Sequence, residues 1–391
     1  MSERFANLQA EVRGFRQHIP SDATHAQKPL VILLHGMGGD RNDWINPFQD
    51  RNWPYDHHRD PDRVDLGVHS RPPIATLPGV ERRRFLSPRV QSNSRGADGS
   101  DDRSWWHALV EAGFPLLTYS QHSGLMVPFG EGPVAEFTRF METLQRDLLR
   151  QPDWQQRQVV IVGHSRGGLI ARAYLGQDEV KVGQGTRFPR VEGLITISSP
   201  HQGSHMALLD DRVIAFLDRL GRFLPFLPGD VIEGLKEKID AYVGDHGDEI
   251  EPDSPLFRAM EAQEPIPGDI RYITVGGTSP RFLRVYVWLF TVGSNLPKRS
   301  ASGKIEFHWQ ARAREVKGAS PFPEGLPLRL LRLRLDEIMA DRGDGLTADG
   351  RCRLPPSFNT EEHFSVPLSH AEELWSPDLQ VQIIERLRKF Q

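Results

Sequence analysis

The sequence predicts an α/β fold in which a mostly parallel sheet is flanked by helices. Short apolar runs rich in β-branched residues alternate with longer segments whose apolar residues recur at helical spacing. Continuous apolar strands are typical of a parallel sheet that is covered on both faces. One run, residues 159–162, passes through a glycine-rich turn directly into a helical pattern. A chain of 391 residues can bury a large core, and we expect residues 1–391 to form a single domain.

The expected strands and helices follow one another along the chain, and glycines or capping residues mark the ends of several of them. Buried strands are predicted at residues 30–34, 114–119, 159–162, 191–197 and 270–277, with a further strand at 326–335. Helices are predicted at residues 3–17, 105–110, 132–151, 168–175 and 377–390. Glycines at 113 and 176 end two of these helices, and Asp101-Asp102 can cap the one that begins at residue 105.

Two long segments depart from this alternation. Residues 41–100 are rich in Arg, Asp, Pro and Gly with little periodicity, which predicts an insertion loop. The histidines and carboxylates at 56–62 could hold a metal, but such residues in a charged loop are more often solvated, so we expect none. Residues 206–260 contain helical pieces broken by prolines and are expected to form a helical cap or lid. Its apolar piece 220–227 either packs into the core or, together with 282–290, faces an acyl pocket.

The turn after residues 159–162 is Gly163-His164-Ser165-Arg166-Gly167, a G-x-S-x-G pentapeptide. Between a strand and a helix this pattern forms a nucleophile elbow, which lifts the serine hydroxyl at the helix N-terminus. The helix dipole there favours developing negative charge. Because the bare pentapeptide occurs by chance in roughly one chain in five of this length, the flanking elements carry the prediction that Ser165 is a nucleophile.

A serine nucleophile needs a base to take its proton and an acid to orient that base. In elbow-type hydrolases these follow in the order serine, acid, histidine. Asp344 lies in a glycine turn after the last strands, and His370 lies in a loop before the final helix. We therefore expect Ser165 to be the nucleophile, Asp344 the acid and His370 the base.

Neighbouring residues leave alternatives open. Asp341 and Asp349 flank the same turn as the predicted acid, and His363 is a rival base. His164 and His201 lie at strand ends near the serine, and we expect them to line the substrate site rather than to act as the base.

A second glycine-rich turn, His35-Gly36-Met37-Gly38-Gly39, follows the strand at 30–34. Such a turn lets the backbone approach a ligand closely and direct an N–H group toward it. In a chain that also has the elbow, we expect this turn to be the oxyanion site, with His35 and Gly36 contacting the substrate.

Five short blocks resemble the bacterial triacylglycerol lipase/esterase family of α/β-hydrolases. They are residues 34–38, 163–168, 196–204, 343–346 and 369–370. The resemblance implies an α/β-hydrolase fold with reduced leading strands and an ester hydrolase that forms an acyl-enzyme on Ser165. It also implies that the backbone N–H groups of Met37 and Arg166 form the oxyanion hole. Secreted members often bind calcium through an aspartate just after the histidine, but Ala371 stands there, so we expect neither calcium nor any cofactor.

The composition of the chain limits which classes of binding partner we expect. The net charge of −4 gives no reason to expect nucleic acid, and Cys352 is the only cysteine, so no intrachain disulfide can form. We find no apolar signal-peptide region and no apolar run of transmembrane length, and expect a cytoplasmic enzyme in transient contact with a lipid interface. A lipid or small-molecule ester is the expected substrate. The alternatives are a lactonase, amidase or acyltransferase with the same residues, or a non-catalytic binding protein.

Overall fold

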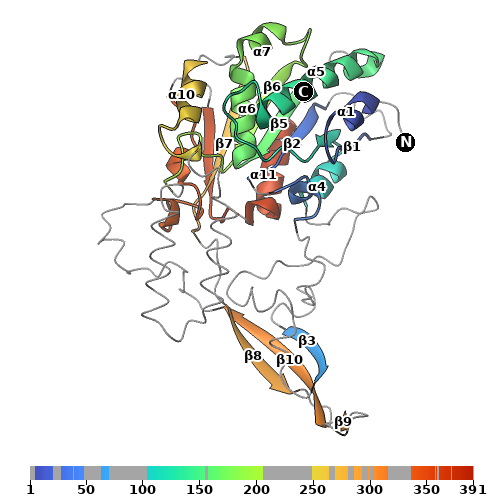
Figure 1. Cartoon of the computed structure of the whole chain (residues 1–391), viewed down its shortest axis with the longest axis vertical. Coiled ribbons are helices and arrows are strands. Elements are labelled where there is room, and N and C mark those ends of the chain that lie inside the picture. Colours follow the sequence, from blue (N-terminus) through green and yellow to red (C-terminus); the bar gives the residue numbers. More distant parts are fainter. Residues whose placement is uncertain are drawn as a thin grey trace.

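The structure is a computed structural model with two groups of elements (Figure 1). It describes residues 5–20, 28–37, 39–47, 63–69, 104–154, 157–205, 249–263, 269–280, 286–292, 298–299, 303, 305–315, 336–356, 358, 361–370 and 372–390. One group is a body with a large sheet between helices, and the other is a small antiparallel sheet that extends away from the body.

The large sheet has seven strands in the order β1-β4-β2-β5-β6-β7-β11. The strands are β1 (Arg16–His18), β2 (Leu30–Leu34), β4 (Leu116–Thr118), β5 (Val159–His164), β6 (Val191–Ile197), β7 (Arg271–Gly277) and β11 (Glu361–Val366). All neighbours pair in parallel except β1, which runs antiparallel to β4 at the edge. The predicted α/β fold with a mostly parallel sheet is confirmed.

Alternate residues of the central strands point into two separate cores. On one face Ile32 and Ile161 pack with helices α1 (Ala6–Glu11), α5 (Gly132–Leu149) and α6 (Arg166–Gly176). On the other face, residues of the same strands pack with α2 (Asn42–Ile45), α4 (Trp105–Glu111) and α11 (Pro377–Leu387). The remaining described helices are α7 (Asp178–Gly183) and α10 (Pro255–Ala262), with short 3₁₀ turns at Pro152–Trp154, Asp336–Ile338, Asp349–Arg351 and Glu372–Leu374. Burial on both faces explains why the central strands are continuously apolar.

The N-terminal segment differs from the prediction of one helix over 3–17. Helix α1 ends at Glu11, and Gly14, with φ +66°, turns the chain into β1. No strand was predicted before residues 30–34, but this leading strand of the described sheet has only three residues, which fits the expected reduction of the leading strands. It could not be read from sequence because its side chains are half-buried and polar.

The small sheet joins segments that are far apart in the sequence. Strand β10 (Ile305–Glu315) pairs antiparallel with β3 (Arg63–His69) and β8 (Tyr286–Val292), and β9 (Lys298–Arg299) pairs with β10. The segment predicted as an insertion loop thus contributes a strand, and residues 286–290 lie in this sheet. Of the cap expected at 206–260, residues 206–248 lie outside the described residues, and the described remainder contains most of α10. The metal-binding candidates at 56–62 and the strand expected at 326–335 also lie outside the described residues.

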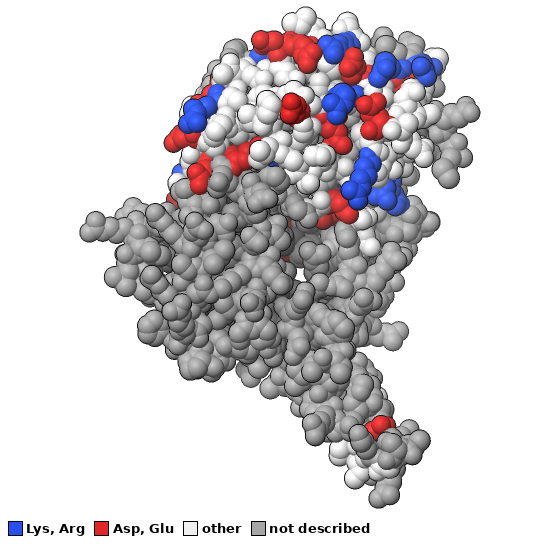
Figure 2. All heavy atoms as spheres, in the orientation of Figure 1, with Lys and Arg blue, Asp and Glu red and all other residues white. Residues whose placement is uncertain are grey.

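Acidic and basic side chains alternate over the described part of the face that Figure 2 shows. Neither sign of charge forms a broad patch over this described part of the surface. Among the helices that the structure describes, none combines the length and apolar character needed to cross a bilayer.

Helix α6 approaches β2 closely because Gly167 has no side chain. A Cβ atom at Gly167 would lie 2.3 Å from the carbonyl oxygen of Leu34 and 2.7 Å from that of His35. Backbone atoms in the middle of a sheet cannot move aside, so this contact fixes the identity of residue 167.

We expect Gly167→Ala to destabilise the fold by about 2 kcal/mol, measured by urea denaturation. Overpacking costs about 1–3 kcal/mol, and a clash with backbone belongs at the upper end, which outweighs the gain of about 1 kcal/mol from replacing glycine by alanine in a helix. Gly350→Ala is the control, because a Cβ atom at Gly350 would meet nothing within 4 Å. Equal stability of the two variants would contradict the packing argument.

Candidate active site

Ser165 lies in a tight turn between the end of β5 and the start of α6. Its backbone has φ 53° and ψ −125°, in the left-handed half of the conformational map, and its side chain is half-buried. The N–H of Ser165 donates to the carbonyl of Ile197 at 2.8 Å, and its carbonyl accepts from the N–H of Gly168 at 3.1 Å. Such backbone strain costs about 1–3 kcal/mol and persists only where the surroundings enforce it. The predicted strand–turn–helix around Ser165 is confirmed.

The glycine turn after β2 lies directly against this serine. A Cβ atom at Gly36 would be 3.1 Å from Cβ of Ser165 and 3.2 Å from Nδ1 of His164. Met37 follows Gly36, and Arg166 is the first residue of α6. Because the first N–H groups of a helix have no partner inside the helix, the N–H of Arg166 is available for an oxyanion. The structure thus brings the two predicted oxyanion segments together.

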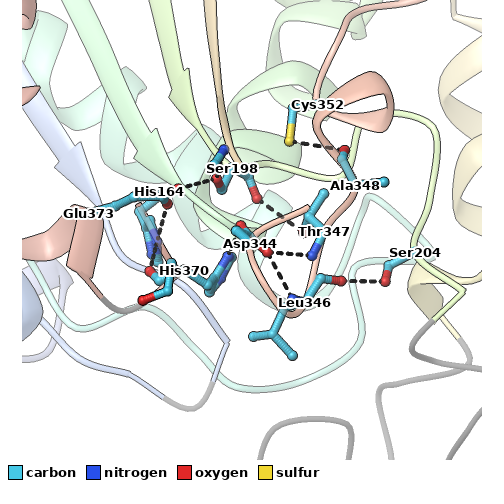
Figure 3. A network of polar contacts seen from close by, with 12 residues as sticks. His164, Ser198, Ser204, Asp344, Leu346, Thr347, Ala348, Cys352, His370 and Glu373 are labelled. Atoms are coloured by element: carbon cyan, nitrogen blue, oxygen red, sulfur yellow. Dashed lines mark hydrogen bonds and ion pairs between the residues drawn. The ribbon is translucent and has the colours of Figure 1, made fainter. Parts of the chain in front are cut away.

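Asp344 and His370 form a buried pair (Figure 3). Oδ2 of Asp344 lies 2.7 Å from Nδ1 of His370, and the N–H of His370 donates to the carbonyl of Asp344 at 3.1 Å. The other carboxylate oxygen, Oδ1, accepts from the N–H groups of Leu346 at 2.8 Å and Thr347 at 2.6 Å. A carboxylate held this way keeps the proton of a neutral His370 on Nδ1 and leaves Nε2 as the basic nitrogen.

The rival acids and base lie elsewhere. Asp349 is paired with His363, with 3.1 Å between Oδ1 and Nε2, and Nδ1 of His363 lies 2.8 Å from Oγ1 of Thr274. Both ring nitrogens of His363 are therefore engaged. Asp341 is exposed, with φ 65°, and its N–H donates to Thr278. The geometry favours Asp344 and His370 over these alternatives.

His164 joins the elbow to the loop that carries His370. The two rings have centroids 4.6 Å apart, and Nε2 of His164 donates to the carbonyl of His370 at 3.1 Å. Burial, together with the nearby charge of His370, holds the pKa of His164 well below its ordinary value. His164 therefore stays neutral and supports the base instead of replacing it.

His35 and His201 have structural partners. Nε2 of His35 accepts from the N–H of Gln121 at 2.9 Å and its Nδ1 donates to the carbonyl of Gly36 at 2.8 Å, so the ring holds the glycine turn and offers no ring nitrogen to a substrate. His201 is buried, with Nε2 2.9 Å from Oγ1 of Thr196. Burial lowers the pKa of both imidazoles, that of His201 strongly. Both were expected to contact substrate, and the structure gives their rings supporting contacts within the fold.

Two charged side chains at the site were not foreseen in these roles. The guanidinium of Arg166 donates to the carbonyl of Gly124 and lies 3.6 Å from the carboxylate of Glu249. Burial lowers the pKa of Arg166, although Glu249 acts in the opposite direction. The carboxylate of Glu249 also accepts from the N–H of Val127 at 3.2 Å, which ties the loop after β4 to the elbow.

Glu373 is a further unforeseen residue, three positions after His370, and it is completely buried. Its Oε1 lies 2.6 Å from Oγ of Ser198, and its Oε2 lies 3.4 Å from Nε2 of His164. A pair of glutamates before a helix usually indicates a solvated turn, so no sequence pattern marked this one as buried.

Within the described residues, one group of side chains offers three ligand atoms that a metal ion could share. The atoms belong to His164, His370 and Glu373 and lie within 4.8 Å of one another. In the present arrangement Nε2 of His164 donates to the carbonyl of His370, and a metal on that nitrogen would break this bond. The group belongs to the candidate active site and does not form a separate site.

A family model agrees with this architecture. Residues 134–227 match the family model described as the PGAP1-like alpha/beta domain, which belongs to the α/β-hydrolase superfamily. The matched segment contains β5, the elbow, α6 and β6. No curated protein matches the chain.

Several solved structures resemble it over most of their length at low identity. The lipase BlEst2 of Bacillus licheniformis in mature form is 14% identical, with 95% of this chain and 97% of that chain covered and a TM-score of 0.42. Esterase B from Lactobacillus rhamnosis is 12% identical, with 99% of this chain and 89% of that chain covered and a TM-score of 0.35.

The buried neutral histidines make stability depend on pH. The pKa values of His35, His164 and His201 are lowered from 6.5 in the folded state, so their contribution is present above about pH 6.5 and is lost as the pH falls. Each adds a slope of up to about 1.4 kcal/mol per pH unit below that value. We expect His201→Gln to reduce the slope of unfolding free energy between about pH 6.5 and 5.5, measured by urea denaturation. An unchanged slope would contradict the assignment of His201 as a buried neutral imidazole.

Proposed function

We propose that this chain is a serine carboxylic ester hydrolase that forms an acyl-enzyme on Ser165. The observation that carries the proposal is the buried Asp344–His370 pair, 2.7 Å between Nδ1 and Oδ2, in a loop fixed to the elbow through His164. The α/β-hydrolase fold and the family match over β5, the elbow and α6 support a hydrolase. The ester bond is the finer part of the proposal.

The mechanism follows from which atoms are fixed. Nε2 of His370 takes the proton of the Ser165 hydroxyl as Oγ attacks the ester carbonyl. Asp344 keeps the ring oriented and stabilises the imidazolium that forms. The negative charge on the carbonyl oxygen is met by the N–H groups of Met37 and Arg166, and such donors contribute about 3 kcal/mol each to transition-state stabilisation.

The alcohol then leaves, and the same residues afterwards act on a water molecule. His370 first returns the proton to the leaving alcohol oxygen, which leaves the acyl group on Oγ of Ser165. The neutral imidazole then takes a proton from water as the water attacks the acyl carbonyl. As that intermediate collapses, the bond between the acyl carbon and Oγ breaks, His370 returns the proton to Oγ, and the carboxylic acid is released.

Two kinds of alternative function are compatible with the same residues: an enzyme that acts on a different bond, and a binding protein without catalytic activity. A lactonase, an amidase or an acyltransferase would keep Ser165, Asp344 and His370, whereas a binding protein would keep only the architecture. Reaction with a fluorophosphonate distinguishes the last case, because only an activated serine is phosphonylated. Hydrolysis of p-nitrophenyl esters of increasing acyl length, and of an emulsified triglyceride, distinguishes esterase from lipase.

Ser165→Ala should abolish hydrolysis of short p-nitrophenyl esters and labelling by the fluorophosphonate. We expect a loss of kcat of about 10⁴-fold or more, since removal of a triad nucleophile leaves only the oxyanion site and binding. Urea denaturation should show that the variant is folded. Turnover close to that of the wild type would exclude Ser165 as the nucleophile.

Two matched pairs of variants identify the acid and the base. Asp344→Asn should lower kcat by about 10⁴-fold because it disrupts the tautomer of His370, and His370→Gln should lower it at least as much. The controls are Asp349→Asn and His363→Gln, which break the second His–Asp pair and should keep most of the activity. If the controls lost activity and the first pair kept it, the roles would have to be reassigned.

A further inference from the structure

Glu373 has an environment that ordinary surface glutamates lack. Its carboxyl group is completely buried at the ends of three strands, with Ser198 after β6, His164 at the end of β5 and Gly277 at the end of β7. Within the described chain its one ion-pair contact is with His164, which is neutral, so no cation compensates a charge on it. An uncompensated buried carboxylate is strongly unfavourable.

A second acid lies beside it. A Cβ atom at Gly277 would be 2.4 Å from Oε1 of Glu373 and 2.6 Å from Cβ of Asp344, so both acids border the same glycine. Two carboxylates in one buried site do not both ionise readily. Asp344 accepts two backbone N–H groups and faces His370, and these contacts favour charge on Asp344. Of the two acids, the geometry therefore favours the proton on Glu373.

The backbone of Glu373 is also fixed. Its carbonyl accepts from Nε1 of Trp105 at 2.8 Å, and its N–H donates to the carbonyl of Ser369 at 3.3 Å. The short turn after His370 is thus tied to α4 and to the residue before the base. The side chain reaches Ser198 and His164, and His164 in turn donates to the carbonyl of His370 (Figure 3).

We propose that Glu373 is a positioning residue that, as a neutral carboxylic acid, fixes the loop of His370 without adding a second negative charge beside Asp344. This inference rests on the proposed function. The titratable groups that face Glu373 are Asp344, His164 and His370, with the thiol of Cys352 close enough to interact electrostatically. Burial raises the pKa of Glu373 well above its ordinary value, and the charge of Asp344 raises it further.

Neutrality matters because the base must lose its proton during turnover. A charge on Glu373 would stabilise the imidazolium of His370 and raise the pH at which the ring becomes a free base. A neutral acid keeps the hydrogen bond with Ser198 and the contact with His164 without adding this effect. Glu373 therefore fixes the position of the His370 loop but adds no negative charge beside His370.

Glu373→Gln and Glu373→Ala test this distinction. Glutamine is a neutral group of the same shape, so we expect kcat/KM on a p-nitrophenyl ester to stay within about threefold and the midpoint of the acid limb to remain unchanged. Glu373→Ala should lower kcat at least about tenfold with little change in KM, because the loop loses its fixed position. Glu385→Gln, on the exposed side of α11, is the control for loss of a carboxylate and should leave kcat and KM unchanged.

Two outcomes would overturn the proposal. If Glu373→Gln lost as much activity as Glu373→Ala, or if its acid limb moved to lower pH, Glu373 would be acting as a charged group. Should Glu373→Ala fail to fold, Glu373→Gln still decides through the acid limb, and Ser198→Ala removes one hydrogen bond of the acid and should lower kcat with KM unchanged.

Spectroscopy separates this inference from the proposed function. An infrared carbonyl band of a protonated carboxyl group should be present in the wild type at neutral pH and absent from Glu373→Gln. The NMR titration of His370, assigned with His370→Gln, should have the same midpoint in the wild type and in Glu373→Gln. Both measurements need no ester turnover, so a chain without esterase activity would refute the proposed function and leave the protonation of Glu373 to be decided on its own.

Discussion

The left-handed backbone at Ser165 is the constraint on which the rest of the site depends. A residue with φ 53° between a strand and a helix needs its neighbours to approach more closely than side chains allow. Gly167 supplies that approach toward β2, and Gly36 supplies it toward the serine itself. The bond from the N–H of Ser165 to Ile197 then requires β6 to lie beside β5 in register. One strained residue thereby fixes the relative positions of three strands.

Parallel strands bring the remaining groups to the same edge. The carboxyl ends of β5, β6 and β7 deliver His164, Ser198 and Gly277 to one place, although more than 100 residues separate the first from the last. In open parallel sheets, ligands bind at this edge for the same reason. The segment between β10 and β11 adds Asp344, and the loop after β11 adds His370.

Few of the titratable side chains at this buried edge of the sheet carry a charge. Burial keeps His35 and His164 neutral, and the geometry gives the negative charge to Asp344. A single fixed anion beside His370 is what a base needs, since further buried charge would shift the balance between imidazole and imidazolium. His35 and His164 therefore support the site as neutral side chains.

The sequence was informative where function is encoded locally. The elbow and the glycine turn after β2 are contiguous motifs, so their strand, turn and helix could be predicted. Strands β1 and β11 were not foreseen because each lies at a sheet edge and lacks a continuous apolar run. Strand β3 pairs with β10, which lies more than 200 residues later in the sequence, and local sequence patterns do not predict a pairing over such a distance.

Burial was the property that sequence could not supply. Glu373 stands beside Glu372 in a polar turn, and only the ends of three strands around it make it a buried acid. In the same way Asp349 flanks the turn of Asp344, and the sequence alone left it open as an alternative acid. Their difference comes from the register of β11 on β7, which sets His363 beside Thr274 and within reach of Asp349.

The two His–Asp pairs show why the position of the base at a strand end matters. His363 lies within β11, where neighbouring elements occupy both ring nitrogens, so its imidazole has no lone pair left for a substrate proton. His370 lies four residues beyond the end of the same strand, and within the described residues the hydrogen bond of its ring to Asp344 uses Nδ1. A base requires one nitrogen fixed and the other free. Leaving the strand gives His370 that freedom, while Asp344 and the contacts through His164 and Glu373 restrict the ring and its loop to one position.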